Sequence, residues 1–461
     1  MLKTKAAMQV VDGEKLPEDT ILLSEAYARS RKIPQGQHIV LKFGAFRRHV
    51  KVIPAARFDG IRISRALADK MGLRVENPRQ LHLRMQYRAS TGTLALGPLI
   101  AVLVSRDYPH MPERPFGSIT MFCKELAEAC RLQGVYVYFV TPKDLRGGAL
   151  EITGWTHSEG GWLRNELPLP DIINNRLTSR KLENSPRVQN FIKQARQLNR
   201  THVFNEKFLD KTEVFEALRK DETLHKLLPE SHPLRGYATL KAMCAKYPVV
   251  FLKPVRGSLG KGIIRVSRAE NNGYMAQYAA PTGTRRQLYP SLAKLYVHLS
   301  SKVKSVKYQA QQGLQLIEVG KRPVDFRALV QKNGSGEWMI TSIVARTAGS
   351  QHFVSNLARG GTLSKVSAAV EKSNLAGGTK RLESAKKLRG AALLIARGIE
   401  EHIPAHFGEL GIDLALDTSG RVWLIEVNSK PSKNDNTPLS EGKIRPSVRM
   451  MILYARYLTG F

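Results

Sequence analysis

The alternation of apolar and polar positions predicts short strands in the N-terminal part of the chain. Strand-like alternation runs through residues 38–43 and 50–53, and another strand is expected at residues 80–85. Between them, residues 64–71 carry apolar positions at helical spacing. Short strands with one short helix are typical of a small β-rich unit, which we place at residues 1–92.

Continuous apolar runs replace this alternation in the next part of the chain. Residues 99–104 and 135–140 read as buried strands, and residues 119–133 between them have helical periodicity. Strand, helix and strand in this order predict a parallel sheet, so residues 93–200 are expected to form an α/β domain. Its polar stretch at residues 174–183 is either part of a cleft or a structural turn.

Residues 201–461 combine apolar strands, hairpin turns and helices in a third region. Asp210 followed by Glu213 fits a capping box at the start of a helix. A later helix is expected within residues 387–402. Strands are expected at residues 247–254, 263–266, 324–330, 411–417 and 422–428.

The last two of these strands bring acidic and amide side chains together. Residues 417–420 read as a turn, so the two strands form a hairpin. If Leu416 pairs with Arg421, Asp413 lies opposite Leu424 and diagonal to Glu426, and Asn428 shares the face of Glu426. Oxygen donors of this kind suit Mg²⁺ that carries nucleotide phosphates. The alternative is a solvated edge strand.

A glycine-rich loop lies between the strands at residues 247–254 and 263–266. Lys253 ends the first strand, and Gly257, Gly260 and Gly262 permit positive φ and close approach of the backbone to phosphate. A strand follows the loop, unlike the helix of a P-loop or Rossmann turn. The alternative is an ordinary turn.

Two arginine-containing segments suggest a second anion site. Asp325 and Arg327 share one face of a strand, and Arg346 ends a later one. A polar loop with a double glycine follows and contains Asn356 and Arg359. Arginines held in this way would neutralise a transferring phosphoryl group, whereas the simpler interpretation is a surface salt bridge.

Composition and charge limit the partners and the cellular compartment that are expected for the chain. The chain has 461 residues, a formal net charge of +33 and 3 cysteines, and 42% of its residues are hydrophobic. The charge predicts affinity for polyanions, although no nucleic-acid module is recognisable. No apolar run is long enough to predict a membrane span, and the N-terminus lacks the apolar core of a secretory signal. Cysteines without metal-ligand spacing fit a reducing compartment, with Cys123 and Cys130 as core residues of a helix.

Together these motifs resemble a known family. In order and rough spacing they match the ATP-grasp superfamily through Lys211, Lys253, residues 257–262, Asp325-Phe-Arg327, residues 355–361, Asp413 and Glu426-Val-Asn428. Within that superfamily, the chain is most similar to the YheC/YheD-type endospore-coat-associated proteins of spore-forming Firmicutes. That resemblance adds residues 96–100 and 169–176, followed by Arg180 and Glu183.

The resemblance implies an ATP-grasp fold of the α/β (α+β) kind over residues 201–461, behind a pre-ATP-grasp α/β domain and the β-rich N-terminal domain. It also implies roles for single residues. Nucleotide binding falls to Lys211 (or alternatively Lys207), Lys253, Gly257, Ser258, Gly260, Lys261, Gly262, Gln312 and Leu314. Metal binding falls to Asp413, Glu426 and Asn428, and catalysis to Arg327, Arg346, Asn356 and Arg359.

The function implied by the family is an ATP-dependent ligase that joins a carboxylate to an amine through an acyl-phosphate, with ATP and Mg²⁺ as cofactors. The expected partners are carboxylate and amine substrates, together with an acidic polymer or spore-coat components. The expected location is the cytoplasm, with association with the endospore coat. Two alternatives stay open: a structural ATP-binding coat protein with little turnover, and an ATP-grasp kinase.

Overall fold

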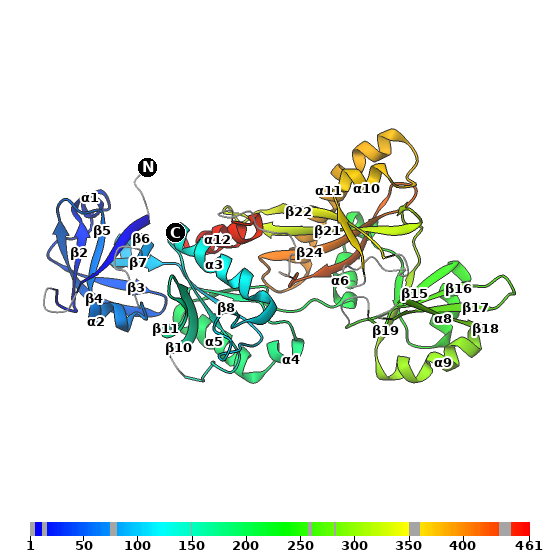
Figure 1. Cartoon of the computed structure of the whole chain (residues 1–461), viewed down its shortest axis with the longest axis horizontal. Coiled ribbons are helices and arrows are strands. Elements are labelled where there is room, and N and C mark those ends of the chain that lie inside the picture. The colour runs from blue at the N-terminus through cyan, green and yellow to red at the C-terminus, as the bar shows by residue number, and fades with distance from the viewer. Residues whose placement is uncertain are drawn as a thin grey trace.

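The computed structural model describes residues 5–11, 16–73, 81–148, 150–256, 261–280, 283–349, 360–432 and 444–461. Figure 1 shows an elongated molecule, with the N-terminal β-domain at one end and the β15–β19 lobe (residues 249–312) at the other. Between these two ends lie a middle domain and a second C-terminal lobe. In the described residues, no helix combines the length and apolar character that a membrane span requires.

The N-terminal domain is a closed β-barrel, which agrees with the predicted β-rich character. Around the barrel the strands are β1 (Lys5–Val11), β5 (Gly60–Ser64), β2 (Thr20–Ser24), β4 (Phe46–Ala55), β3 (His38–Phe43), β7 (Thr93–Gly97) and β6 (Leu81–Arg88). Pairing of β1 with β6 closes the barrel. Fully buried side chains such as Met8, Ile21 and Leu41 fill its interior.

Two similar strand-to-helix turns occur in this barrel. β2 leads into α1 (Glu25–Ser30) and β5 into α2 (Arg65–Lys70), the helix predicted at residues 64–71. Ser24 caps α1 by accepting from the Tyr27 N–H at 3.4 Å, and Ser64 caps α2 by accepting from the Leu67 N–H at 3.2 Å. A short 3₁₀ turn, η1 (Ala89–Thr91), precedes β7.

The middle domain is built on one six-stranded sheet. Its strands in order are β11 (Gly161–Pro168), β10 (Glu151–Ser158), β9 (Tyr136–Val140), β8 (Leu99–Leu103), β12 (Ile172–Asn175) and β13 (His202–Phe204). The four strands from β9 to β13 are parallel, which confirms the predicted parallel arrangement. Its helical segments are η2 (Gly117–Ile119), α3 (Thr120–Gln133), α4 (Arg180–Glu183) and α5 (Pro186–Asn199).

The C-terminal helix returns to this middle domain. α12 (Pro446–Thr459) shares a hydrophobic core with α3, in which Ile452 is fully buried and Phe122 is nearly so. Figure 1 shows α12 beside α3, close to the marked C-terminus. Cys123 and Cys130 are buried in the same core, as predicted, and burial raises the pKa of both thiols.

The first lobe of the third region has an antiparallel sheet covered by helices on one face. Its strands in order are β14 (Ser231–Pro233), β19 (Tyr308–Gln312), β15 (Val249–Pro254), β16 (Ile264–Arg268), β17 (Tyr274–Ala280) and β18 (Gly283–Tyr289). Val250 and Leu252 pack in a core with residues of α8 (Tyr237–Lys246) and α9 (Leu292–Ser305). Because side chains alternate along a strand, Phe251 and Lys253 point to the uncovered face.

The second lobe repeats this plan. Its sheet runs β23 (Thr362–Ser364), β22 (Trp338–Thr347), β21 (Arg322–Lys332), β24 (Glu409–Leu416) and β25 (Val422–Asn428), with β20 (Glu318–Val319) paired to β21. Its helices are α6 (Lys211–Leu218), α7 (Glu222–His225), α10 (Val366–Glu371) and α11 (Gly378–His402). Phe326, Ala328 and Leu414 pack in one core with residues of α11. The other face of β21 and β24 therefore presents its polar residues to the opposite lobe.

Candidate functional site

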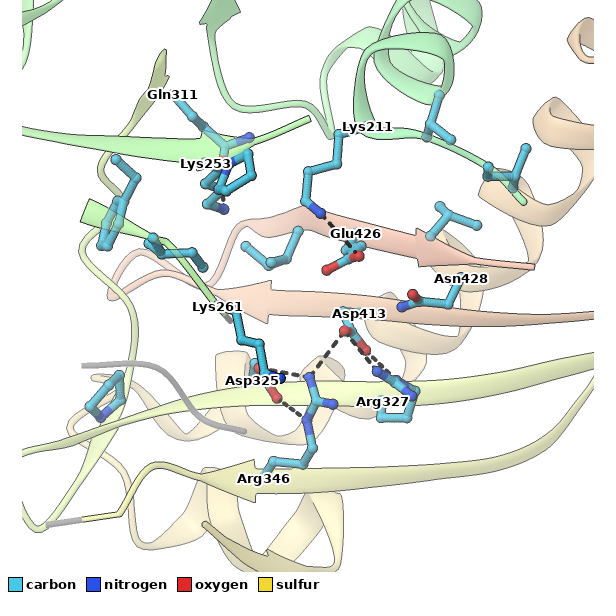
Figure 2. A pocket seen from close by; sticks show the side chains of 18 of the residues that line it. Lys211, Lys253, Lys261, Gln311, Asp325, Arg327, Arg346, Asp413, Glu426 and Asn428 are labelled. Carbon is cyan, nitrogen blue, oxygen red and sulfur yellow. Dashed lines mark hydrogen bonds and ion pairs between the residues drawn. The ribbon is translucent and has the colours of Figure 1, made fainter. Parts of the chain in front are cut away.

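A cleft of about 1410 Å³ lies between the uncovered faces of the two lobes. Side chains of β15, β16, β19, β21, β22, β24 and β25 line it, together with the start of α6. The middle domain closes one end with residues 176–178 and Arg180. Three parts of the chain, far apart in sequence, therefore contribute to one cavity, part of which is shown in Figure 2.

The predicted hairpin exists, but the predicted register is wrong. Leu416 pairs with Val422 and not with Arg421, and the ladder shifts by one residue between Leu414 and Asp413. The shift leaves Ile425 without a partner in the ladder, as in a β-bulge. Asp413 consequently lies directly opposite Glu426.

The bulge also changes which side chains share a face. Regular alternation predicts that Leu424 and Glu426 point the same way, but Leu424 is fully buried in the α11 core. Glu426 and Asn428 instead line the cleft with Asp413. The predicted grouping of these three oxygen-bearing side chains is present, although it arises from a bulge that the sequence pattern did not reveal.

Opposite charges alternate across the second lobe's sheet. Asp325 on β21 pairs with Arg346 on β22, and Arg327 on β21 pairs with Asp413 on β24. Arg346 donates Nε to Asp325 Oδ1 at 2.6 Å and Nη2 to Asp325 Oδ2 at 2.8 Å, while its Nη2 also lies 3.2 Å from Asp413 Oδ2. Arg327 donates Nη2 to Asp413 Oδ2 at 2.9 Å and Nε to Asp413 Oδ1. Figure 2 shows both arginines converging on Asp413.

These contacts hold Asp413, Arg327 and Arg346 in their charged forms. Burial raises the pKa of Asp413, but the charges of Arg327 and Arg346 outweigh it and bring that pKa to about 2. Burial likewise lowers the pKa of Arg346, but Asp413 and Asp325 reverse the effect and raise it above its usual value. The simple surface salt bridge considered from the sequence is excluded, because Asp325, Arg346 and Asp413 are all less than 10% exposed.

Glu426 and Asn428 complete the oxygen-donor face. Lys211 Nζ lies 3.2 Å from Glu426 Oε1, and both Glu426 and Asn428 are half-buried. Asp413 Oδ2 already accepts two arginine donors, whereas Oδ1 accepts one and keeps a second lone pair. Two carboxylates and an amide thus have capacity for a hard cation such as Mg²⁺ without loss of the arginine contacts. Within the described ranges, no cluster of three or more His, Cys, Asp or Glu side chains has metal-binding geometry.

Lys253 faces this group from the opposite lobe. It donates Nζ to Gln311 Oε1 on the neighbouring strand β19. Burial lowers the pKa of Lys253 to about 8, with a further decrease from the charge of Lys211, and Glu426 opposes both effects. An anion that enters the cleft would favour the protonated, charged form of Lys253.

Several other predicted residues also line the cleft. Lys261 is exposed there. Gly262 is not among the lining residues but follows Lys261 directly, with φ +74°, and its carbonyl accepts a hydrogen bond from the Tyr308 hydroxyl at 3.1 Å. Gln312 and Leu314 lie on the segment that connects the two lobes. Gly257, Ser258, Gly260, Asn356 and Arg359 lie outside the described residues.

The structure separates the two lysines considered for one position. Asp210 caps α6 by accepting from the Glu213 N–H at 2.9 Å, as predicted, and this places Lys211 in the first turn of the helix. Lys211 projects into the cleft, whereas Lys207 pairs with Glu213 at 2.5 Å and is not among the lining residues.

Residues 174–183 contribute both to the cleft wall and to a buried network. Arg176 forms an ion pair with Glu409 and donates to the Pro431 carbonyl at 2.5 Å. Lys430 forms an ion pair with Glu183, and each of these two side chains is 3% exposed. Sequence reasoning missed Lys430 and Glu409 as partners. The only available signal was the presence of unusually many charged residues in otherwise apolar strands.

Known proteins resemble this chain over much of its length. A family model described as YheC/D-like ATP-grasp matches residues 200–458. Endospore coat-associated protein YheD of Bacillus subtilis (strain 168) is 28% identical over 343 residues, covering 74% of this chain and 74% of that protein. Endospore coat-associated protein YheC of the same strain is 22% identical over 322 residues, covering 68% and 85%. Among solved structures, D-cycloserine synthetase DcsG aligns with a TM-score of 0.45 and 13% identity, covering 78% of this chain and 99% of that one.

Proposed function

The chain belongs to the YheC/D-like ATP-grasp family, and from this premise we propose that it is an ATP-dependent ligase that joins a carboxylate to an amine. The observation that carries the proposal is the charge arrangement of the cleft. Lys253 faces the paired groups of Asp413, Arg327 and Arg346 from the opposite lobe. Lys211 lies beside Glu426 on the same lobe as these groups. Cations on both walls of a cavity suit a polyphosphate with a reacting carboxylate beside it.

In this proposal the nucleotide lies between the lobes. Gln312 and Leu314 would contact its base from the connecting segment, and Lys211 and Lys253 would bind its phosphates. Lys261, at the end of the glycine-rich loop, would lie beside the same phosphates, and Gly262 follows it in the chain. Binding would raise the pKa of Lys253, because the phosphate charge favours its protonated form.

Asp413, Glu426 and Asn428 would hold Mg²⁺, which supplies charge neutralisation to the phosphates. Lys211 contacts Glu426, one of these three residues. Its ammonium group would therefore lie beside the same phosphates. The fit rests on the remaining lone pairs of the three side chains described above.

Arg327 and Arg346 would neutralise the phosphoryl group during its transfer. An oxygen of the substrate carboxylate attacks the γ-phosphorus, the bond to the β-phosphate oxygen breaks, and ADP leaves. The amine then attacks the acyl carbon, phosphate leaves with the former carboxylate oxygen, and the amine loses a proton. Because Asp325 and Asp413 already fix both guanidinium groups, little reorganisation is needed as charge develops.

The proposal also covers location. Two relatives are named endospore coat-associated proteins, which supports a chain that acts in the cytoplasm and associates with the spore coat. The formal charge of +33 agrees with affinity for an acidic polymer or other anionic components of such an assembly.

A screen for ADP release tests the proposal. Purified protein with Mg·ATP is incubated with amino acids, peptides and acidic polymers, with and without hydroxylamine. A ligase releases ADP only with a carboxylate acceptor, and hydroxylamine converts its acyl-phosphate to a hydroxamate. A stable phosphate ester would identify a kinase instead. Tight nucleotide binding without ADP under every mixture would favour a structural ATP-binding protein.

A further inference from the structure

The end of the cleft beside the middle domain differs in chemistry from the rest. Apolar side chains form its wall, with hydroxyl groups and one arginine among them. The apolar residues are Val104, Ile119, Phe122 and Leu177, and the polar ones are Ser118, Thr178 and Arg180. An apolar wall with a few fixed polar groups is the usual character of a small-molecule site.

Arg180 is held in place without a carboxylate partner. Its Nη2 donates to the Leu209 carbonyl at 2.5 Å, and its guanidinium lies 5.3 Å from the centre of the Phe208 ring. In the described residues, no carboxylate oxygen lies within ion-pair distance of Arg180, unlike Arg176 and Lys430, which form buried ion pairs. Arg180 is therefore an oriented cation that a ligand carboxylate can contact directly, although the charges of Asp210, Glu183 and Glu213 act on it from a longer distance.

The charges that line the cleft also favour an anionic ligand in addition to the nucleotide. Its described lining contains twelve lysine and arginine side chains and four aspartate and glutamate side chains. Arg176 and Lys430 are neutralised by Glu409 and Glu183, which lie outside the lining. A magnesium-bound nucleoside triphosphate brings about two net negative charges, which leaves several cations without a counter-charge.

We propose that the carboxylate substrate is a dicarboxylate with an apolar middle. One carboxylate would be activated beside Lys211, Arg327 and Arg346. The other would bind Arg180, with the carbon skeleton against Ile119, the partly exposed residue of the apolar wall. This inference rests on the proposed ligase function, and it names the class of substrate that the ligase activates.

Calorimetry with saturated dicarboxylates of four to eight carbons, and with monocarboxylates of the same lengths, tests the inference. The protein is first saturated with Mg²⁺ and the non-hydrolysable nucleotide AMP-PNP. At least one dicarboxylate is expected to bind roughly tenfold or more tightly than its matched monocarboxylate, since a charged hydrogen-bonded contact is added. Equal affinities, or no binding by either series, would overturn the inference.

Two variants of Arg180 and one control variant locate the effect. Arg180→Gln should remove the preference for dicarboxylates and leave the affinity for AMP-PNP unchanged, whereas Arg180→Lys, which keeps the charge, should retain part of it. Arg187→Gln removes an exposed arginine of α5 outside the cleft and should change neither affinity. Unchanged dicarboxylate binding in Arg180→Gln would overturn the assignment. If the wild-type protein fails to bind AMP-PNP, the proposed function fails first, and this inference falls with it.

Discussion

Asp413 lies where the two arginines of the second lobe meet, and its carboxylate fixes both. Glu426, directly opposite on β25, is bound by the lysine of another element, α6. The two acids therefore have different roles. In the proposed mechanism, Asp413 would order the cations around the transferring group, and Glu426 would be the more accessible oxygen donor. Because their environments differ, we expect substitutions of Asp413 and of Glu426 to have different effects.

Replacement of Glu426 by Ala should abolish turnover and leave the fold intact. The carboxylate is half-buried and has a single described partner, Lys211, so its loss should change the melting temperature little. Turnover should fall by about 10² or more, because a charge-stabilising group of the transfer step is removed. Calorimetry of Mg·ATP binding and steady-state ADP release measure both effects, and Glu401→Ala on the exposed surface of α11 serves as control. Normal turnover with unchanged Mg·ATP affinity would refute the metal assignment.

Nucleotide affinity should depend on the proton of Lys253. The free protein holds the pKa of Lys253 at about 8, lowered first by burial, so the lysine loses its charge as pH rises through that value. The affinity for ATP should therefore decrease above pH 8, whereas Lys253→Arg, which stays charged, should flatten the profile. Isothermal titration between pH 6.5 and 9.5 in buffers of matched ionic strength checks this. A flat wild-type profile would show that Lys253 makes no contact with phosphate.

At the level of elements, the two lobes form the cleft because helices leave one face of each sheet uncovered where β15 and β21 line it. Side-chain alternation correctly predicted that Asp325 and Arg327 share one face of β21. The hairpin register was not predictable, because the bulge at Ile425 depends on how Leu424 and Val427 fit the α11 core. Regular alternation of apolar and polar residues along a strand does not indicate where the pairing register shifts by one residue. The three oxygen donors lie together, as expected, but for a different reason. The shift places Asp413 directly opposite Glu426, whereas the predicted register placed the two diagonally.

Gly262 should matter more for nucleotide binding than for stability. Its φ of +74° is costly for other residues, and an added Cβ would lie 3.1 Å from Pro254 Cγ. Gly262→Ala should cost about 1 kcal/mol through the backbone and raise the KM for ATP several-fold. Gly148→Ala, at φ +80° with open space around it, imposes the same backbone cost away from the cleft. Equal effects of the two substitutions on KM would remove any special role for Gly262.

For the whole molecule, the decisive contacts join parts of the chain that no local pattern connects. The acids and bases of residues 174–183 were visible in the sequence, but their partners Glu409 and Lys430 lie more than two hundred residues away. The return of α12 to the middle domain was equally hidden, because its apolar face could pack on any exposed core. The net charge predicted affinity for anions but not where they bind, since most of the cations are spread over the surface.

The Glu183–Lys430 pair should couple the middle domain to the second lobe. Both side chains are only 3% exposed, so Glu183→Gln leaves a buried ammonium without a counter-charge. This should reduce the free energy of unfolding by about 3–5 kcal/mol. The double substitution Glu183→Leu with Lys430→Met should cost clearly less, because neither charge remains. Urea unfolding of the wild-type protein and both variants measures the difference. A single variant as stable as wild type would show that the pair does not hold the domains together.

Transfer of oxygen from the substrate to phosphate tests the central claim most directly. A carboxylate that supports ADP release is labelled with ¹⁸O in its carboxyl group, and the phosphate released with the product is examined by ³¹P NMR. The acyl-phosphate route predicts phosphate that carries one ¹⁸O from the carboxylate, formed in step with ADP. On this route the second labelled oxygen stays in the carbonyl group of the product. Phosphate without ¹⁸O from the carboxylate would contradict activation of a carboxylate in this cleft.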